Sequence, residues 1–363
     1  MTNAIYSKDL IGKKQSVTDE ILLLNPNQTP MLNLLGFSEP VIGTTHVWYE
    51  DEVFAQKSTV TTAATAAATE LIVADTEAFR VDSVAQIDEE MLLVAAVDMP
   101  GKKLTVVRGY ANSTAAAIPK DAEIETLFVK GEEGADARQA RYKERQRVEN
   151  YTQIFNDSIE VTGTAQTVAQ YGVSDLYGYE KAKKELEVAL QLEKALINGL
   201  KYDSGNVRQM KGIRSFIQTN VTQATTAVTA NMLNDISQTV YTNGGFANGG
   251  QYAFIVPAKQ KRAISDLQND KLRLVQAETS RGQVVDHIVN DFGQFPVIMN
   301  DNLKSDELMF IDQNRVAIKP LGDRGFNHTL LGVTGDKQQG MIVGEYTLEF
   351  RQEKAHARIK GLK

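Results

Sequence analysis

The sequence contains no cysteine, no long apolar run and no excess of positive charge. Without cysteine, neither disulfide bonds nor thiolate chemistry can take part in its function. No stretch approaches the roughly eighteen consecutive apolar residues of a membrane-spanning helix, and the N-terminal segment MTNAIYSKDLIGKK lacks the apolar core of a signal peptide. The formal net charge of −7 provides no overall attraction to nucleic acid.

Signatures of catalysis and metal binding are also missing. There is no H-E-x-x-H, G-x-S-x-G or Walker sequence, and no histidine has a ligand partner at metal spacing. The glycine-rich stretch 244–250 precedes a strand pattern and has no Lys-Ser/Thr, so we interpret it as a turn. We therefore expect no catalytic, cofactor-binding or metal-binding residues, and the sequence favours a structural assembly protein over an enzyme.

The longest helix signal runs from Ser174 to Gly199 in a chain of 363 residues, 42% of them hydrophobic. Ser174 is the expected N-cap, Asp175 places negative charge in the first turn, and Asn198-Gly199 is a C-terminal stop. Opposite charges one turn apart are expected at Glu180–Lys184, Lys181–Glu185 and Lys183–Glu187. A broad apolar stripe predicts a spine helix packed on an α/β body, and comprises Ala182, Leu186, Ala189, Leu190, Leu192, Leu196, Ile197 and Leu200.

Residues 1–45 have the character of an arm. A short helix is expected at 16–24, and prolines then interrupt regular structure on both sides of a short apolar run. That run contains Leu32, Leu34, Leu35 and Phe37. Two interpretations stay open: the arm packs on its own body, or it is buried on a neighbouring subunit.

A small all-β module is predicted at about 57–130. It begins with a segment rich in Ser, Thr and Ala (57–69), expected to be flexible or an edge strand, and continues with four short strands separated by turns. The strand HVWYEDEVF (46–54) precedes the module, and its expected partner (150–164) follows it. The module therefore interrupts the main fold.

Five cations follow the module in the segment GEEGADARQARYKERQR. Three interpretations stay open for this segment: a solvated connector, docking onto an acidic face of another subunit, and contact with DNA. The acidic composition of the chain and the scarcity of interleaved aromatics disfavour DNA. The cations are Arg138, Arg141, Lys143, Arg145 and Arg147.

The second half of the chain predicts an α/β domain with its own sheet. YAFIV (252–256) is a buried strand pattern, Pro257 begins a helix, and further strands are expected, the last at 316–319. At the end of the chain, apolar residues alternate in GEYTLEF, where Thr347 and Glu349 share the polar face. The alternation then changes phase, which predicts a second strand with His356 and Arg358 facing outward on a solvated or intersubunit face.

Several stretches together resemble the major capsid (major head) proteins of tailed bacteriophages, and more narrowly those with an extra β-rich module. They are LIGKKQSVTDEILLLNPNQTPMLNLLGF, RQMKGIRSFIQTN, YAFIVPAKQKRAI, VVDHIVNDFGQFPVIMNDNL, DELMFIDQNRVAI and GEYTLEFRQEKAHARIKGL. The resemblance implies an α+β Hong Kong 97-type capsid fold. Its parts map to an N-terminal arm (1–45), an extended loop with the inserted module (46–163), a peripheral domain with the spine (164–212 and 321–363) and an axial domain (213–320).

The resemblance also implies a function. Such a protein self-assembles into hexamers and pentamers that form an icosahedral head around double-stranded DNA, without sequence-specific DNA binding. Its partners would be copies of itself, with portal, scaffold and decoration proteins as further candidates, and it would belong to the virion after assembly in the host cytoplasm. The alternatives are an encapsulin-like compartment shell and a host- or glycan-binding virion protein. The expected intersubunit contacts are Leu32, Leu34, Leu35, Phe37, Arg138, Arg141, Arg145 and Arg147.

Overall fold

The computed structural model describes residues 29–168, 173, 175–267, 273–278, 284–333 and 335–363. The expected helix at 16–24 and the expected cap Ser174 lie outside these residues. The chain divides into two compact units. We call Met1–Trp48 with Val148–Lys363 the body, and Tyr49–Arg147 the β unit. Among the described helices, none combines the length and apolarity needed to cross a membrane.

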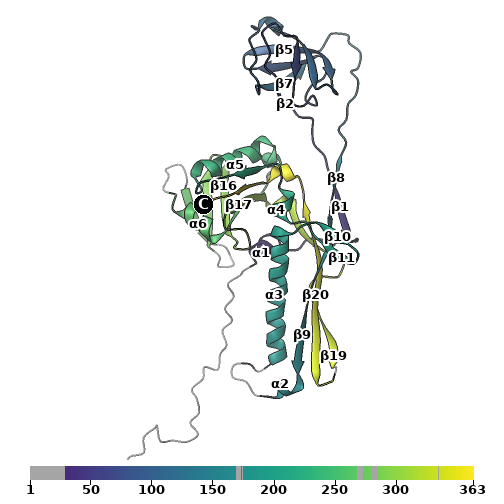
Figure 1. The fold of residues 1–363 in the computed structure, drawn as a ribbon, viewed down its shortest axis with the longest axis vertical. Helices are drawn as coiled ribbons and strands as arrows, with labels where there is room; N and C mark the ends of the chain where they lie inside the picture. The colour runs from purple at the N-terminus through teal and green to yellow at the C-terminus, as the bar shows by residue number, and fades with distance from the viewer. Residues whose placement is uncertain (1–28, 169–172, 174, 268–272, 279–283, 334) are drawn as a thin grey trace, which may run out of the picture. The chain divides into compact units, whose positions relative to one another are not determined.

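The predicted spine is helix α3, Leu176–Asn198 (Figure 1). Asp175 is its N-cap, because the Asp175 carboxylate accepts a hydrogen bond from the Gly178 N–H at 3.0 Å. The apolar stripe is buried mainly in the second half of the helix, whereas Ala182 and Leu200 are exposed instead of widening it. Of the three expected charge pairs, Lys181–Glu185 forms at 3.7 Å, and the other lysines pair at i,i+3 spacing or across to Asp157.

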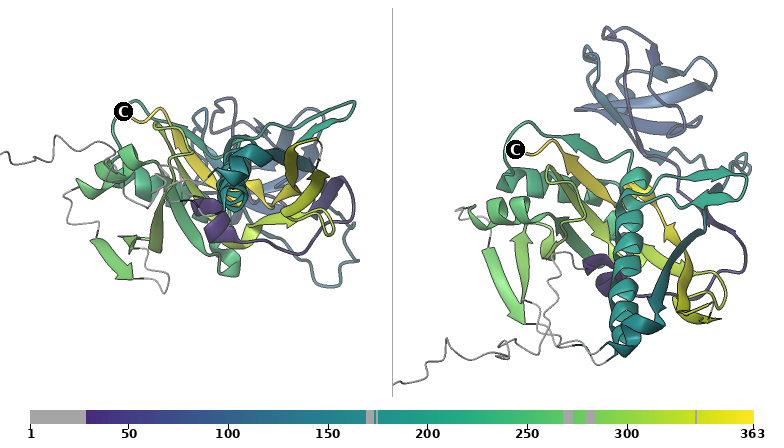
Figure 2. Two further views of the ribbon diagram at one scale, coloured as in Figure 1. Left: turned by 90° about the horizontal axis from the view of Figure 1, so that it is seen from below. Right: turned by 60° about the horizontal axis from the view of Figure 1, so that its bottom comes forward.

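Helix α3 packs beside a sheet built around one long strand, β20 (Lys337–Phe350). Strand β9 (Gln153–Thr162) runs antiparallel to most of β20, while β19 (Asn327–Val333) and β18 (Val316–Pro320) pair with its first and last parts. Figure 2 shows α3 lying along β9 and β20. The expected strand 316–319 thus belongs to this sheet and not to the sheet of the α/β domain.

The α/β part of the body contains a seven-stranded sheet in the order β12-β21-β17-β13-β16-β15-β14. Its centre is β13, in which all five residues are buried, paired antiparallel with β17 and parallel with β16. Helices α5 and α6 belong to this part, and the core here includes the aromatic rings of Phe254, Phe295 and Phe310, which contact one another in tilted and edge-on arrangements. The element bounds are α5 Ala230–Thr242, α6 Ala258–Ser265, β12 Val221–Gln223, β13 Tyr252–Val256, β14 Arg273–Glu278, β15 Val284–Asn290, β16 Gly293–Met299, β17 Glu307–Asp312 and β21 Ala357–Lys360.

The end of the chain differs from the expectation of an outward-facing cationic strand. Strands β20 and β21 belong to different sheets, separated by a turn at Gln352, which has a left-handed φ of 52°. His356 is fully buried, and Arg358 is largely covered. The outward-facing row predicted from the alternation is therefore wrong for His356, because β21 is an interior strand with β12 and β17 on its two sides.

Short elements complete the body. The α1 helix lies ahead of β1, and β1 pairs with β8 as a two-stranded ribbon. Strands β10 and β11 form a small hairpin after α3. Their bounds are α1 Pro30–Leu35, β1 Thr45–Glu50, β8 Gln146–Tyr151, α2 Gly163–Thr167, β10 Tyr202–Ser204, β11 Val207–Gln209 and α4 Ile213–Phe216.

The β unit is a six-stranded antiparallel sheet in the order β2-β7-β4-β5-β6-β3. The two edges meet through a bridge between Val60 and Val73, so the sheet closes around its own apolar core. The expected strands correspond to β3, β5, β6 and β7, and the edge strand considered within 57–69 corresponds to β2, whereas β4 was not expected. The bounds are β2 Lys57–Thr59, β3 Glu70–Ile72, β4 Ser83–Ile87, β5 Glu90–Asp98, β6 Lys103–Val107 and β7 Glu123–Val129.

Candidate contact residues

The apolar residues of the arm lie on and just after α1. Leu32, Leu34 and Leu35 are partly buried against the core formed with α3 and the β20 sheet. Phe37 is 55% exposed, and its ring stacks on Tyr346 at 5.1 Å between ring centres. These residues thus pack on their own body, with Phe37 the most accessible of the four. Their role between subunits stays a prediction.

A carboxylate that the sequence did not single out holds α1 in place. The Glu193 side chain is fully buried on α3 and accepts hydrogen bonds from the Met31 N–H at 2.9 Å and the Leu32 N–H at 3.0 Å. The Asn300 amide donates a third at 2.6 Å. The first N–H groups of a helix have no partner within it, and their dipoles favour negative charge. Burial raises the pKa of Glu193, although all three hydrogen bonds oppose that shift.

The cations of the segment after the β module are engaged inside the β unit. Arg141 lies over the Phe54 ring at 4.1 Å and donates to the Glu77 and Phe79 carbonyls. Lys143 lies 3.1 Å from the Glu77 carboxylate. Arg138 donates to the Lys130 carbonyl, Arg145 lies 3.3 Å from Asp51, and Arg147 lies in β8. This segment is therefore bound to its own unit, and docking on another subunit stays a prediction.

The polar face of β20 is buried under cations. Glu349 is 1% exposed and contacts His46 at 2.6 Å, Lys319 at 2.8 Å and Arg351. Burial alone would raise the pKa of Glu349, but the hydrogen bonds from His46 and Lys319 and the charge of Arg351 lower it to about 2. The expected polar face thus exists, but ion pairs cover it instead of water.

A second carboxylate follows the same pattern four residues earlier on β20. Glu345 is 2% exposed and lies 3.2 Å from both Arg208 and Arg324. The Thr152 hydroxyl donates to it at 2.6 Å. Residues that alternate along a strand share a face, so the two carboxylates lie on one side of β20, about 13 Å apart along the strand.

His356 is held as a neutral imidazole. Its Nδ1 accepts from the Asp312 N–H at 3.1 Å, and its Nε2 lies 3.1 Å from the Arg351 carbonyl, which requires the proton on Nε2. Burial lowers the pKa of His356 to about 3. This histidine therefore serves as an uncharged bridge between β17 and the end of β20.

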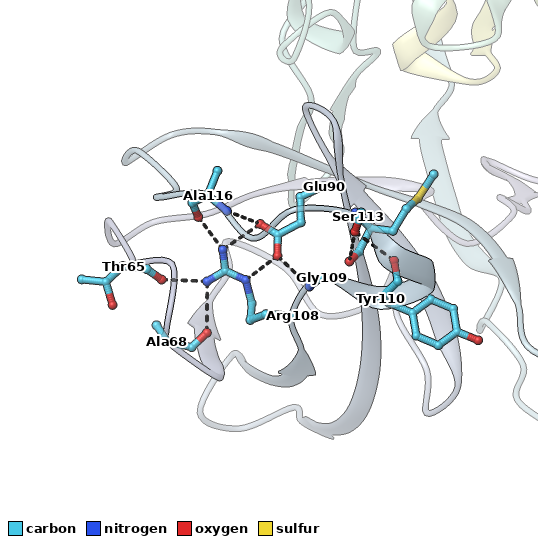
Figure 3. A network of polar contacts seen from close by, with 9 residues as sticks. Thr65, Ala68, Glu90, Arg108, Gly109, Tyr110, Ser113 and Ala116 are labelled. Carbon is cyan, nitrogen blue, oxygen red and sulfur yellow. Dashed lines mark hydrogen bonds and ion pairs between the residues drawn. The ribbon is translucent and has the colours of Figure 1, made fainter.

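In the β unit, Glu90 and Arg108 form a buried, bidentate ion pair with both distances 2.7 Å (Figure 3). Arg108 also donates to the Thr65, Ala68 and Ala116 carbonyls. The segment rich in Ser, Thr and Ala (57–69), expected to be flexible or an edge strand, thus begins as edge strand β2 and is held near its end by the Arg108 guanidinium. The contacts described so far are of the kind that hold chain segments together, and the described residues contain no group of three or more His, Asp or Glu side chains suited to a metal ion.

Comparison with solved structures shows the class of fold. The cyanophage A-1(L) capsid protein matches with a TM-score of 0.54 and 10% identity over 100% of this chain and 99% of that chain. The capsid of the native GTA particle matches with a TM-score of 0.54 and 9% identity over 98% of each chain. The body and β unit therefore have the fold of a phage-type capsid protein.

The sequence identifies the family directly. The model of the SU10 major capsid protein family matches residues 2–363, and the chain belongs to this family. It is a major capsid protein, a structural component of the virus particle. An encapsulin complex from Synechococcus elongatus PCC 7942 matches with a TM-score of 0.44 and 11% identity over 61% of this chain and 78% of that chain. Comparison with curated proteins finds no match.

Proposed function

We propose that this protein assembles through contacts between its own copies into hexamers and pentamers that close an icosahedral phage head around double-stranded DNA. The observation that carries the proposal is the family match over residues 2–363. In Hong Kong 97-type terms, residues 1–45 act as the arm and 46–163 as an extended loop that carries the β unit. Residues 213–320 act as the axial domain, and 164–212 with 321–363 as the peripheral domain.

Physical features of the chain support an assembly role. Several large apolar side chains are exposed in the body, among them Phe37 at 55% and Ile42 at 102%. Obligate subunit interfaces bury roughly 2,000–5,000 Å² and are more apolar than transient ones. Apolar groups on an arm and an extended loop are therefore suited to bury surface on neighbouring copies. The acidic net charge of −7 is compatible with DNA packing that does not depend on sequence.

Electron microscopy of the purified full-length chain tests the proposal. Under a series of salt, pH and concentration conditions, with portal and scaffold proteins added in parallel samples, we expect closed shells with fivefold and sixfold capsomers. Monodisperse monomers under every condition would contradict self-assembly. Particles recovered from infected cells are expected to contain nuclease-protected DNA of mixed sequence.

The role of the arm is tested with two truncations. Deleting residues 1–28 leaves α1 and its contacts with Glu193 intact, whereas deleting 1–35 removes the Met31 and Leu32 donors and exposes core surface. We expect the shorter deletion to keep the fluorescence of buried Trp48, the only tryptophan, while abolishing shells. Normal shells from this truncation would refute the arm's role, and the longer deletion shows how much of any loss comes from unfolding.

A further inference from the structure

The net charge is concentrated in one part of the chain. Residues 49–147, the β unit, contain 18 acidic and 12 basic side chains, a net charge of −6. Because the whole chain carries −7, the body is close to neutral. The β unit is therefore the part that a positively charged surface on another molecule would attract.

Within the β unit, one exposed segment brings three acidic side chains close together along the chain. Lys57, Arg108, Lys143 and Arg145 are each engaged with carboxylates of their own unit. Residues 131–140 are exposed throughout, and in the described structure no ion pair involves Glu133 or Asp136. We call Glu132, Glu133 and Asp136 the acidic loop, of which Glu132 contacts Lys130 at 2.7 Å.

The body offers the opposite arrangement on the polar face of β20. There, two carboxylates are 2% exposed or less, while the Arg324 and Arg351 side chains above them are 54% and 56% exposed. What reaches solvent is thus positive charge, held in position by buried anions. We call these cations the basic cluster: Arg208, Lys319, Arg324 and Arg351, with His46 beside them.

We propose that the basic cluster of one copy docks the acidic loop of a second copy. This deepens the proposed self-assembly and rests on it. It also reverses the polarity suggested by the sequence, because the cations at 138–145 are used within the β unit and its carboxylates are left for the partner. Guanidinium groups suit such docking, since they bind carboxylates with two parallel hydrogen bonds. Anchoring by Glu345 and Glu349 reduces the side-chain entropy that the arginines lose on binding.

Charge reversal tests this inference in the full-length chain. The cluster variant is Arg324→Glu/Arg351→Glu, and the loop variant is Glu133→Lys/Asp136→Lys. Each places like charges opposite one another, so we expect each alone to give roughly tenfold fewer shells than the wild type, counted by electron microscopy and sedimentation. A chain with all four substitutions is expected to recover assembly, and an equal mixture of the two variants to yield more shells than either alone.

Controls separate docking from folding and from net charge. Tryptophan fluorescence checks that the cluster variant is folded. The milder variant Arg324→Gln/Arg351→Gln removes the charges without reversing them, and we expect it to lose fewer shells than the cluster variant. Asp88→Lys/Glu89→Lys makes the same change in net charge as the loop variant, at an exposed turn of the β unit, and is expected to assemble normally.

Each remaining outcome contradicts the inference. Normal shells from the cluster variant overturn the inference. This includes normal shells that lack packaged DNA, a result that would indicate that the basic cluster binds DNA instead. Failure of the four-substitution chain to recover also overturns it. Recovery by that chain but not by the mixture excludes docking between copies. In all these cases wild-type shells still form, so the proposed function is judged separately.

Discussion

Glu90 in the β unit and Glu193 in the body are buried among different partners. In the β unit, burial raises the pKa of Glu90, but hydrogen bonds from Arg108 and from the Ala116 and Gly109 N–H groups outweigh it, and the pKa is lowered. In the body, the described partners of Glu193 are three N–H donors, and burial raises its pKa. Both side chains are almost inaccessible to solvent. The opposite directions of the two pKa shifts agree with a counter-ion at Glu90 and with neutral N–H donors as the described partners of Glu193.

This difference also separates two ways of holding a segment. Arg108 and Glu90 together bind the chain near residues 65, 68, 109 and 116 through charged groups that compensate each other. Glu193 binds the start of α1 through the partial positive charge of a helix end, a weaker compensation than a full cation. We therefore expect the two sites to respond differently to substitution and to pH.

The largest expected effect is that of Arg108→Ala in the β unit. Removing one partner of a buried ion pair leaves the other charge uncompensated, which costs about 3–5 kcal/mol. Hydrogen exchange of the β4, β5 and β6 amides is suitable here, since the only tryptophan lies in the body. Protection of these amides should collapse toward that of an unfolded unit, while Trp48 fluorescence stays unchanged.

A double substitution, Arg108→Met/Glu90→Leu, is the matched control. It removes both charges and keeps most of the volume, so we expect it to cost clearly less than Arg108→Ala alone. Equal losses in the two variants would mean that packing, and not charge compensation, is what the pair contributes. The proposed difference between Glu90, stabilised by a counter-ion, and Glu193, stabilised by N–H donors, would then not hold for the β unit.

The sequence predicted the elements whose pattern is local. The spine, β13 and four strands of the β unit follow from periodicity or apolar runs, because neighbours in sequence reveal them. Strand β4 was missed, since SVAQI is short and contains a polar residue on a buried stretch. The arm's apolar residues were found, but where they pack depends on a surface far away in the chain.

Long-range contacts explain what was missed at the candidate site. Glu193 lies within the apolar stripe of the helix, because Leu190 and Ile197 are three residues before and four residues after it, and this spacing is a local sign of burial. Its partners, however, lie 161, 162 and 107 residues away and could not be read from the sequence. His356 was assigned outward because alternation identifies two faces without showing that both are covered. For the same reason the ion-paired burial of Glu345 and Glu349 could not be predicted from the alternating pattern of β20.

Acid titration gives the next largest effect, centred on Glu349. Its pKa in the folded protein is about 2, below the ordinary value of 4.5. A lowered pKa means that this group stabilises the fold above its ordinary pKa, and that the contribution is lost as pH falls from about 4.5 toward 2. The shift corresponds to roughly 3 kcal/mol. Unfolding followed by Trp48 fluorescence should show this loss in the wild type and a shallower decline in Glu349→Gln.

Glu160→Gln is the matched control for that titration. Glu160 forms an exposed pair with Lys337 on the same sheet, and exposed pairs contribute little because water screens them. Its substitution should leave the acid profile nearly unchanged. If Glu349→Gln declined as steeply as the wild type between pH 4.5 and 2, other carboxylates would have to account for the acid sensitivity of the body.

The smallest effect is expected for Glu193→Gln, and the informative result is whether the effect on stability grows or shrinks as pH falls. The amide keeps one oxygen for the α1 N–H groups but turns an NH₂ toward donors, which costs about 1–2 kcal/mol. Because burial raises the pKa of Glu193, the folded state favours its neutral form, and the wild type gains stability from this group as pH falls. The difference between wild type and Glu193→Gln should therefore be larger at pH 5 than at pH 8, opposite to the trend for Glu349→Gln. Trp48 fluorescence measures the stability of both variants, because Glu193 and Glu349 lie in the same unit as Trp48. A stability difference between wild type and Glu193→Gln that shrinks toward pH 5 would contradict this prediction. It would show that the helix end stabilises the Glu193 carboxylate as effectively as the cations stabilise that of Glu349.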